Sequence, residues 1–195
     1  MCGLSLYRAG EVAKAAALLN SIKGGSASID VLRAFAAADL HSDAAQGIKV
    51  YEEAANRYTD RGELDFLQLS LLGLGQAPHA SSALRKIRQS APPYPKFYRG
   101  FFETAAAYVC NELSEEELMR RAGSDRWDQA IGALRIGLRR LGEGDRRGAR
   151  ECFEKIASWP VFGVWDHDLG WVLLKRMEQD PDWPPWIPAR GPTGP

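Results

Sequence analysis

Residues 127–160 constrain the fold of this chain more than any other segment. The segment is marked by small residues, a turn, a large apolar residue and a closing proline: Gly137, Gly144-Asp145, Ala149, Phe153 and Pro160. In a pair of antiparallel helices, small residues let the helices approach closely, and a large residue four positions later points into the seam between them. The segment therefore predicts two helices joined by a tight turn.

Earlier parts of the chain repeat this small-then-large pattern. Three more such pairs, each just after a turn, are Ala15/Leu19, Gly47/Tyr51 and Ala80/Leu84. The large members, Phe153 included, lie 32, 33 and 69 positions apart, and the last spacing is close to two periods. The member missing from that gap is expected near residue 118, where Leu118 and Ala122 stand. The sequence thus predicts helix pairs that recur at a nearly constant interval.

Over roughly residues 1 to 163 the chain resembles the tetratricopeptide repeat (TPR) family, whose period is about 34 residues. The resemblance implies a right-handed α-solenoid of antiparallel helix pairs, with a concave groove lined by the first helix of each pair. Two units depart from the pattern, because residues 4–8 alone precede the first turn and the fourth unit begins with a long expected helix over 97–110. Arrays of helix pairs without the strict consensus stay open as an alternative.

Residue content agrees with an all-α protein. Ala and Leu dominate, and no alternating run bounded by turn residues suggests a strand. Ser114 followed by Glu117 predicts a capping box at the start of one helix. A chain of 195 residues suits one domain of ordinary size. We expect one helical repeat domain over residues 1–179 and a Pro/Trp-rich tail over 180–195.

The last part of the chain predicts a capping helix and then an extended tail. The capping helix, over residues 164–177, has five apolar residues on one face: Trp165, Leu169, Val172, Leu173 and Met177. A terminal repeat needs such a cap to shield its last seam. The proline-rich tail is expected to run extended. Its tryptophans, Trp183 and Trp186, either fold back on the cap or the groove, or dock into a partner or a neighbouring copy.

Charge and apolar content exclude several classes of partner. Lys+Arg and Asp+Glu both number 25, so the net charge of zero argues against nucleic acid or an anionic membrane as partner. No apolar run approaches the roughly 18 residues of a membrane span. The start of the chain lacks the pattern of a signal peptide, so we expect a cytoplasmic protein. The odd number of widely spaced cysteines fits a reducing compartment.

Few residues suggest catalysis. Cys2-Gly3 resembles the start of class II glutamine amidotransferases, but that family needs strands after the cysteine, and residues 7–21 predict an amphipathic helix. His41, His79 and His167 lack the spacing of metal ligands. Asp166 and Asp168 are expected to cap and charge the start of the last helix. We therefore predict no catalytic residue, no metal and no cofactor.

Arginine is concentrated in residues 120–150. This stretch holds nine arginines and four acids. One interpretation is a solvated helix surface with arginine stems over apolar neighbours. The other is a basic patch for an acidic peptide, a carboxylate or a phosphate, which arginine binds bidentately. Nucleic acid is disfavoured because aromatic residues do not interleave with the arginines.

Together these features predict a non-enzymatic scaffold or adaptor that binds a peptide or helix of another protein. In one version of this hypothesis, the partner protein carries an acidic segment. The groove residues expected from the repeat frame are Asp65, Leu69, Leu72, Glu103, Arg135 and Arg139. An alternative is a structural subunit of a larger assembly, or a self-associating chain, that packs through Phe97, Tyr98, Phe101, Phe102 and the tryptophan tail. A remote alternative is an amidohydrolase that uses Cys2.

Overall fold

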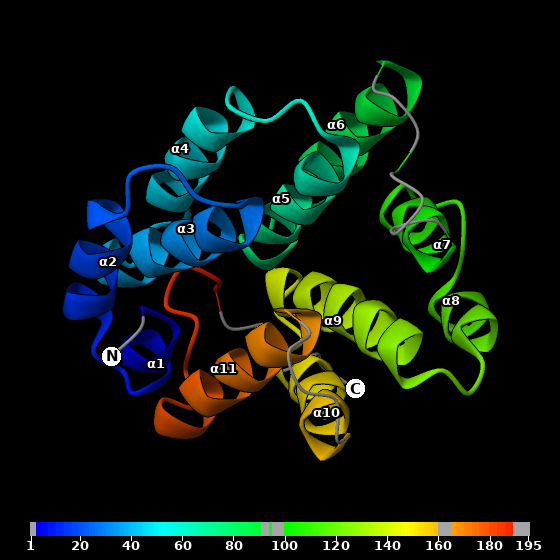
Figure 1. Cartoon of the computed structure of the whole chain (residues 1–195). Coiled ribbons are helices and arrows are strands. Elements are labelled where there is room, and N and C mark those ends of the chain that lie inside the picture. The colour runs from blue at the N-terminus through cyan, green and yellow to red at the C-terminus, as the bar shows by residue number, and fades with distance from the viewer. Residues whose placement is uncertain (1–2, 91–93, 95–99, 160–164, 189–195) are drawn as a thin grey trace.

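The computed structural model describes residues 3–90, 94, 100–159 and 165–188. These residues form eleven helices and no strand, which confirms the all-α prediction (Figure 1). The helices are α1 (Gly3–Arg8), α2 (Val12–Ser21), α3 (Ala27–His41), α4 (Ala44–Ala55), α5 (Arg61–Gly73), α6 (Ala77–Ser90), α7 (Phe101–Val109), α8 (Glu115–Ala122), α9 (Arg126–Gly142), α10 (Arg146–Ser158) and α11 (Trp165–Gln179).

Short polar side chains start several of these helices. The oxygens that accept from backbone amides of the first turn belong to Asp43, Asp60, Ser114, Asp125 and Asp145. Each satisfies a donor that the helix itself leaves unpaired. At Ser114 the hydroxyl accepts from the Glu117 amide as predicted, but the Glu117 carboxylate accepts from Arg120 and Arg121.

The predicted helix pairs are present. The pairs α1/α2, α3/α4, α5/α6 and α9/α10 pack together, and the small and large residues that predicted them are buried: Ala15, Leu19, Gly47, Tyr51, Ala80, Leu84, Ala149 and Phe153. A Cβ atom placed on Gly137 would lie 2.6 Å from Cε1 of Phe153, so α9 and α10 approach at a point where only glycine fits without a shift. Burial in these seams holds the pairs together.

The fourth unit differs from the pattern. Of the expected long helix over 97–110, the described part is the short α7, and residues 97–99 lie outside the described residues. Helices α7 and α8 pack against each other and against α9. Helix α5 packs directly on α9, so the core continues from the α5/α6 pair to the α9/α10 pair.

The first and last helices meet. The side-chain amide of Gln179, at the end of α11, donates to the carbonyl of Arg8 at 2.8 Å. The Arg8 guanidinium lies 4.2 Å from the ring centroid of Trp171. Consecutive contacts α1–α2–α3–α5–α9–α11–α1 therefore form a closed circuit (Figure 1).

The tail crosses the middle of this circuit (Figure 1). Its described part, residues 180–188, is neither helix nor strand, as predicted, but it is not simply extended, because Trp183 and Ile187 donate backbone hydrogen bonds to Asp180 and Pro184 in two turns. The indole nitrogen of Trp183 donates to Asp39 at 3.1 Å, and Trp183 is fully buried. The tail is thus folded back on its own chain.

Candidate functional site

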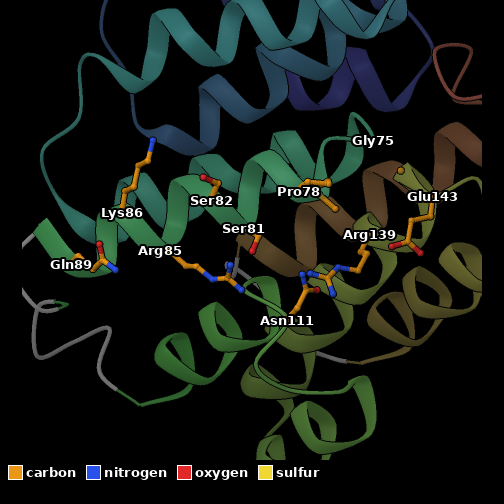
Figure 2. Close-up of a pocket in the computed structure, with 12 residues that line it drawn as sticks. Gly75, Pro78, Ser81, Ser82, Arg85, Lys86, Gln89, Asn111, Arg139 and Glu143 are labelled. Atoms are coloured by element: carbon orange, nitrogen blue, oxygen red, sulfur yellow. The ribbon is translucent and has the colours of Figure 1, made fainter.

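A cleft of 710 Å³ opens between α6 and the end of α9 (Figure 2). Ser82, Arg85 and Lys86 line it from α6, and Arg139 lines it from α9. Glu143, just after α9, lies at the end of the cleft beside Arg139 in Figure 2. The cleft is therefore lined by three cationic side chains and one carboxylate.

The sequence of α6 explains why its cations face the cleft. Ala80 and Leu84, the small-then-large pair, are buried against the core. Residues on the other side of an amphipathic helix must then face solvent, and Arg85 and Lys86 are exposed. No acidic residue occurs between Ala77 and Ser90, so α6 has no carboxylate of its own to neutralise them.

Both arginines of the cleft are anchored on the end of α7. Nη2 of Arg139 donates to the carbonyls of Tyr108 and Val109 at 3.2 and 3.0 Å, and its guanidinium lies 4.4 Å from the Tyr108 ring centroid. Arg85 donates to the carbonyl of Cys110. The last carbonyls of a helix carry partial negative charge, so they hold these guanidinium groups in place without neutralising them.

The cationic charge of the cleft is not paired within the described part of the chain. Arg85, Lys86 and Arg139 take part in none of the ion pairs of the described residues. Glu143 is the one carboxylate among the described residues that line the cleft, so the three cations leave an excess of positive charge there, which favours a negatively charged group.

The six residues predicted for the groove separate in the structure. Arg139 lines the cleft. Glu103 lies on α7, where it accepts from Arg61 at 2.9 Å. The other four are buried in the core between α5 and α9: Asp65, Leu69, Leu72 and Arg135. These four do not form a surface that a partner can reach in this structure.

Arg135 is a buried structural ion rather than a surface group. Its guanidinium donates to Asp65 at 3.1 Å and to Asp166 at 3.2 Å, and it is fully buried. Burial raises the pKa of both carboxyl groups, although the positive charge of Arg135 opposes that shift. Asp166 and Asp168 lie in the first turn of α11, as expected, and the Asp166 carboxylate in addition accepts from Arg135.

Most of the arginine-rich stretch is accounted for within the chain. Arg120 and Arg121 pair with Glu117, Arg140 pairs with Glu115, Arg147 with Glu151 and Arg150 with Glu154. These acids lie outside residues 120–150, so counting charges inside the stretch overstated its excess. The structure therefore agrees with the solvated-surface interpretation for these arginines.

The residues of the alternative hypotheses are placed only in part. Cys2, Phe97 and Tyr98 lie outside the described residues, Phe101 is buried and Phe102 is half-buried. Trp183 and Trp186 are both buried by the fold-back of the tail. Residues 3–21 contain α1 and α2, where class II amidotransferases have strands.

The described residues offer neither a metal site nor a membrane span. They contain no cluster of three or more His, Cys, Asp or Glu side chains placed to hold a metal ion. Among the helices that the structure describes, none combines the length and the apolarity needed to cross a membrane.

Sequence reasoning missed the cleft residues of α6. The available signal was the run Arg85-Lys86 with Arg88 in a helix that lacks acids. Arginine is more abundant over 120–150, but most arginines of that stretch pair with acids of neighbouring segments.

No family model matches this chain, and neither the curated proteins nor the solved structures contain a significant match to it.

Proposed function

We propose that the protein is a non-enzymatic binding module that holds an acidic segment of another protein in the cleft between α6 and α9. In this proposal the helix pairs form a TPR-like right-handed solenoid, and the cleft replaces the inner groove as the docking site. The observation that carries the proposal is a set of three cleft cations, Arg85, Lys86 and Arg139, none of which forms an ion pair with a carboxylate of the described residues.

The shape of the cleft supports a short segment as the ligand. Its 710 Å³ lies within the range of about 300–1,000 Å³ typical of small-ligand sites, so a few residues fit in it rather than a long helix. The two guanidinium groups are already held by carbonyls of α7, so binding does not have to order them. Pre-ordered donors lower the entropic cost of association.

The chemistry of the cations supports carboxylates as the recognised groups. A guanidinium group offers parallel N–H donors that match a carboxylate, whereas the ammonium of Lys86 acts as a mobile point charge.

The test is binding of a fluorescein-labelled peptide that alternates Glu with Gly, measured by fluorescence anisotropy against the same peptide with Gln in place of Glu. We expect binding of the Glu peptide only, and affinity that falls as salt is added. Lys86→Glu should weaken binding at least about tenfold, because it replaces an attractive charge with a repulsive one.

Arg147→Glu is the matched control, because the Arg147 side chain is 92% exposed on α10 and does not line the cleft. This variant changes the net charge of the protein by the same amount as Lys86→Glu. Equal loss of affinity in the two variants, or equal binding of the Gln peptide by the parent protein, would refute the cleft as an acidic-segment site.

A further inference from the structure

The described part of the tail, residues 180–188, packs against the wall of the cleft. Gly75 and Gly142 both line the cleft, while none of these described tail residues lines it. A Cβ atom placed on Gly75 would lie 3.0 Å from Cδ1 of Ile187. Ile187 is therefore in contact with a residue whose other side faces the cleft.

Gly75 and Gly142 also touch each other through their backbones. A Cβ atom on Gly142 would lie 3.0 Å from Cα of Gly75 and 2.1 Å from the carbonyl oxygen of Leu72. Gly75 has a φ of 78°, which favours glycine and ends α5 in a tight turn. The turns after α5 and α9, which set the two sides of the cleft, are thus packed directly on one another.

The tail is held at this place by two sets of contacts. The indole nitrogen of Trp186 donates to the carbonyl of Gly73 at 3.1 Å, and its ring stacks on Phe35 at a centroid distance of 6.3 Å. Arg146, the first residue of α10, donates through Nη2 to the carbonyls of Pro184 and Ile187 at 3.1 and 2.7 Å. The tail thereby connects the end of α5 with the start of α10.

From this geometry we infer that the docked tail fixes the spacing between α6 and the end of α9, so that Ile187 and Trp186 are positioning residues for capture of the acidic segment. The inference rests on the proposed function of the cleft. Coupling of this kind is reciprocal, so occupation of the cleft also tightens the docking of the tail.

The test compares Ile187→Ala with the parent protein in the same anisotropy assay. We expect Ile187→Ala to bind the Glu peptide about fivefold or more weakly, the lower end of ordinary coupling between sites. The slope of affinity against salt should stay unchanged, because no charge is altered. Ile187→Leu, which keeps an apolar side chain of the same size, should restore binding.

Ile156→Ala is the matched control. Ile156 is fully buried and contacts Gly170 in the seam between α10 and α11, and it does not line the cleft. This variant removes the same atoms from the core and should bind the Glu peptide within about twofold of the parent, because remote sites are usually independent.

A second readout follows the tail itself. The full chain is labelled with 5-fluorotryptophan, and the Trp186 resonance is assigned by its loss in Trp186→Phe. We expect this fluorine resonance to shift as the Glu peptide saturates the cleft.

The outcomes separate the two proposals. If the parent protein does not bind the Glu peptide, the proposed function and the coupling both fall. If the parent binds and Ile187→Ala binds equally well, or if Ile156→Ala is weakened as much, the coupling is overturned while the function stands. A Trp186 resonance that does not move at saturation also overturns the coupling.

Discussion

Arg135 and Arg139 show how far the surroundings decide what one residue type does. They lie one turn apart on the same side of α9, yet Arg135 is fully buried and Arg139 lines the cleft. Helix α5 covers the part of α9 that carries Arg135, and the end of α7 lies beside the part that carries Arg139. The sequence predicted a shared role because it shows spacing along a helix but not which neighbour covers each turn.

Arg135 should be essential for stability. Arg135→Met keeps the apolar stem but leaves the buried Asp65 and Asp166 without a cation, which should lower the free energy of unfolding at pH 7 by about 3–5 kcal/mol. Urea denaturation followed by circular dichroism measures this. Arg120→Met is the control, because the Arg120 side chain is 70% exposed, and it should leave the free energy of unfolding almost unchanged.

The loss in free energy of unfolding caused by Arg135→Met should also depend on pH. Burial raises the pKa of Asp65 and Asp166 above the value of the unfolded chain, and loss of the guanidinium raises it further. A carboxyl group with a raised pKa takes up its proton in the folded state first, so folding gains stability as the pH falls through the folded pKa. The difference in free energy of unfolding between variant and parent should therefore become smaller from pH 7 toward pH 4. A gap that stays constant or widens would contradict this account of the buried ion.

At the scale of the elements, helix pairs were predictable and the packing between distant helices was not. The small-then-large pairs report contacts between helices that are neighbours in sequence, and those residues are buried as expected. The contact between α5 and α9 joins segments separated by the whole of α6, α7 and α8, and no local pattern encodes it. For the same reason Leu69 and Leu72 were expected in a groove although they are buried.

The seam between α9 and α10 should tolerate no side chain at Gly137. Gly137→Ala places a Cβ atom 2.6 Å from Cε1 of Phe153, so the ring or the helix must shift. Overpacking of this kind costs about 1–3 kcal/mol, which exceeds the gain of at most about 1 kcal/mol from the better helix propensity of alanine. Thermal and urea denaturation should both show the loss.

Gly132→Ala, in the same helix, is the control. Its Cβ atom would meet Sδ of Met119 at 3.0 Å, and a thioether can move aside, so this variant should be close to neutral or stabilised. The double variant Gly137→Ala with Phe153→Leu should recover part of the loss, because the smaller side chain leaves room for the methyl group. Strict additivity of the two single changes would show that Gly137 and Phe153 do not constrain each other.

At the scale of the whole molecule, the tail acts as a structural element. The sequence left open whether Trp183 and Trp186 fold back or dock elsewhere, since composition alone does not show which surface is close to the end of α11. In the structure the meeting of α1 with α11 brings that end over α3, where Asp39 accepts from both Arg176 and Trp183. The cleft was equally invisible, because α6 and α9 are brought together by contacts between elements far apart in the sequence, among them α5 on α9 and α7 on both α6 and α9.

Arg146 should hold the tail in place. Its guanidinium donates to four carbonyls of the tail, those of Asp182, Trp183, Pro184 and Ile187. A hydrogen bond to a charged group contributes about 1.5–3 kcal/mol. Because one guanidinium group makes all four bonds, their contributions do not add in full, and Arg146→Met should lower the free energy of unfolding by about 2–4 kcal/mol. The backbone amides of Trp183 and Ile187 should exchange with solvent faster in the variant, because the tail opens before the rest of the fold.

The adjacent Arg147 provides a control that differs only in what it contacts. Its side chain is 92% exposed and pairs with Glu151 in the same helix, so Arg147→Met should change stability by less than about 0.5 kcal/mol and leave exchange in the tail unchanged. If Arg146→Met and Arg147→Met have the same stability and the same exchange in the tail, the contacts of Arg146 with the tail carbonyls do not stabilise the fold. In that case burial of Trp183 and Trp186 alone holds the tail across the circuit of helices.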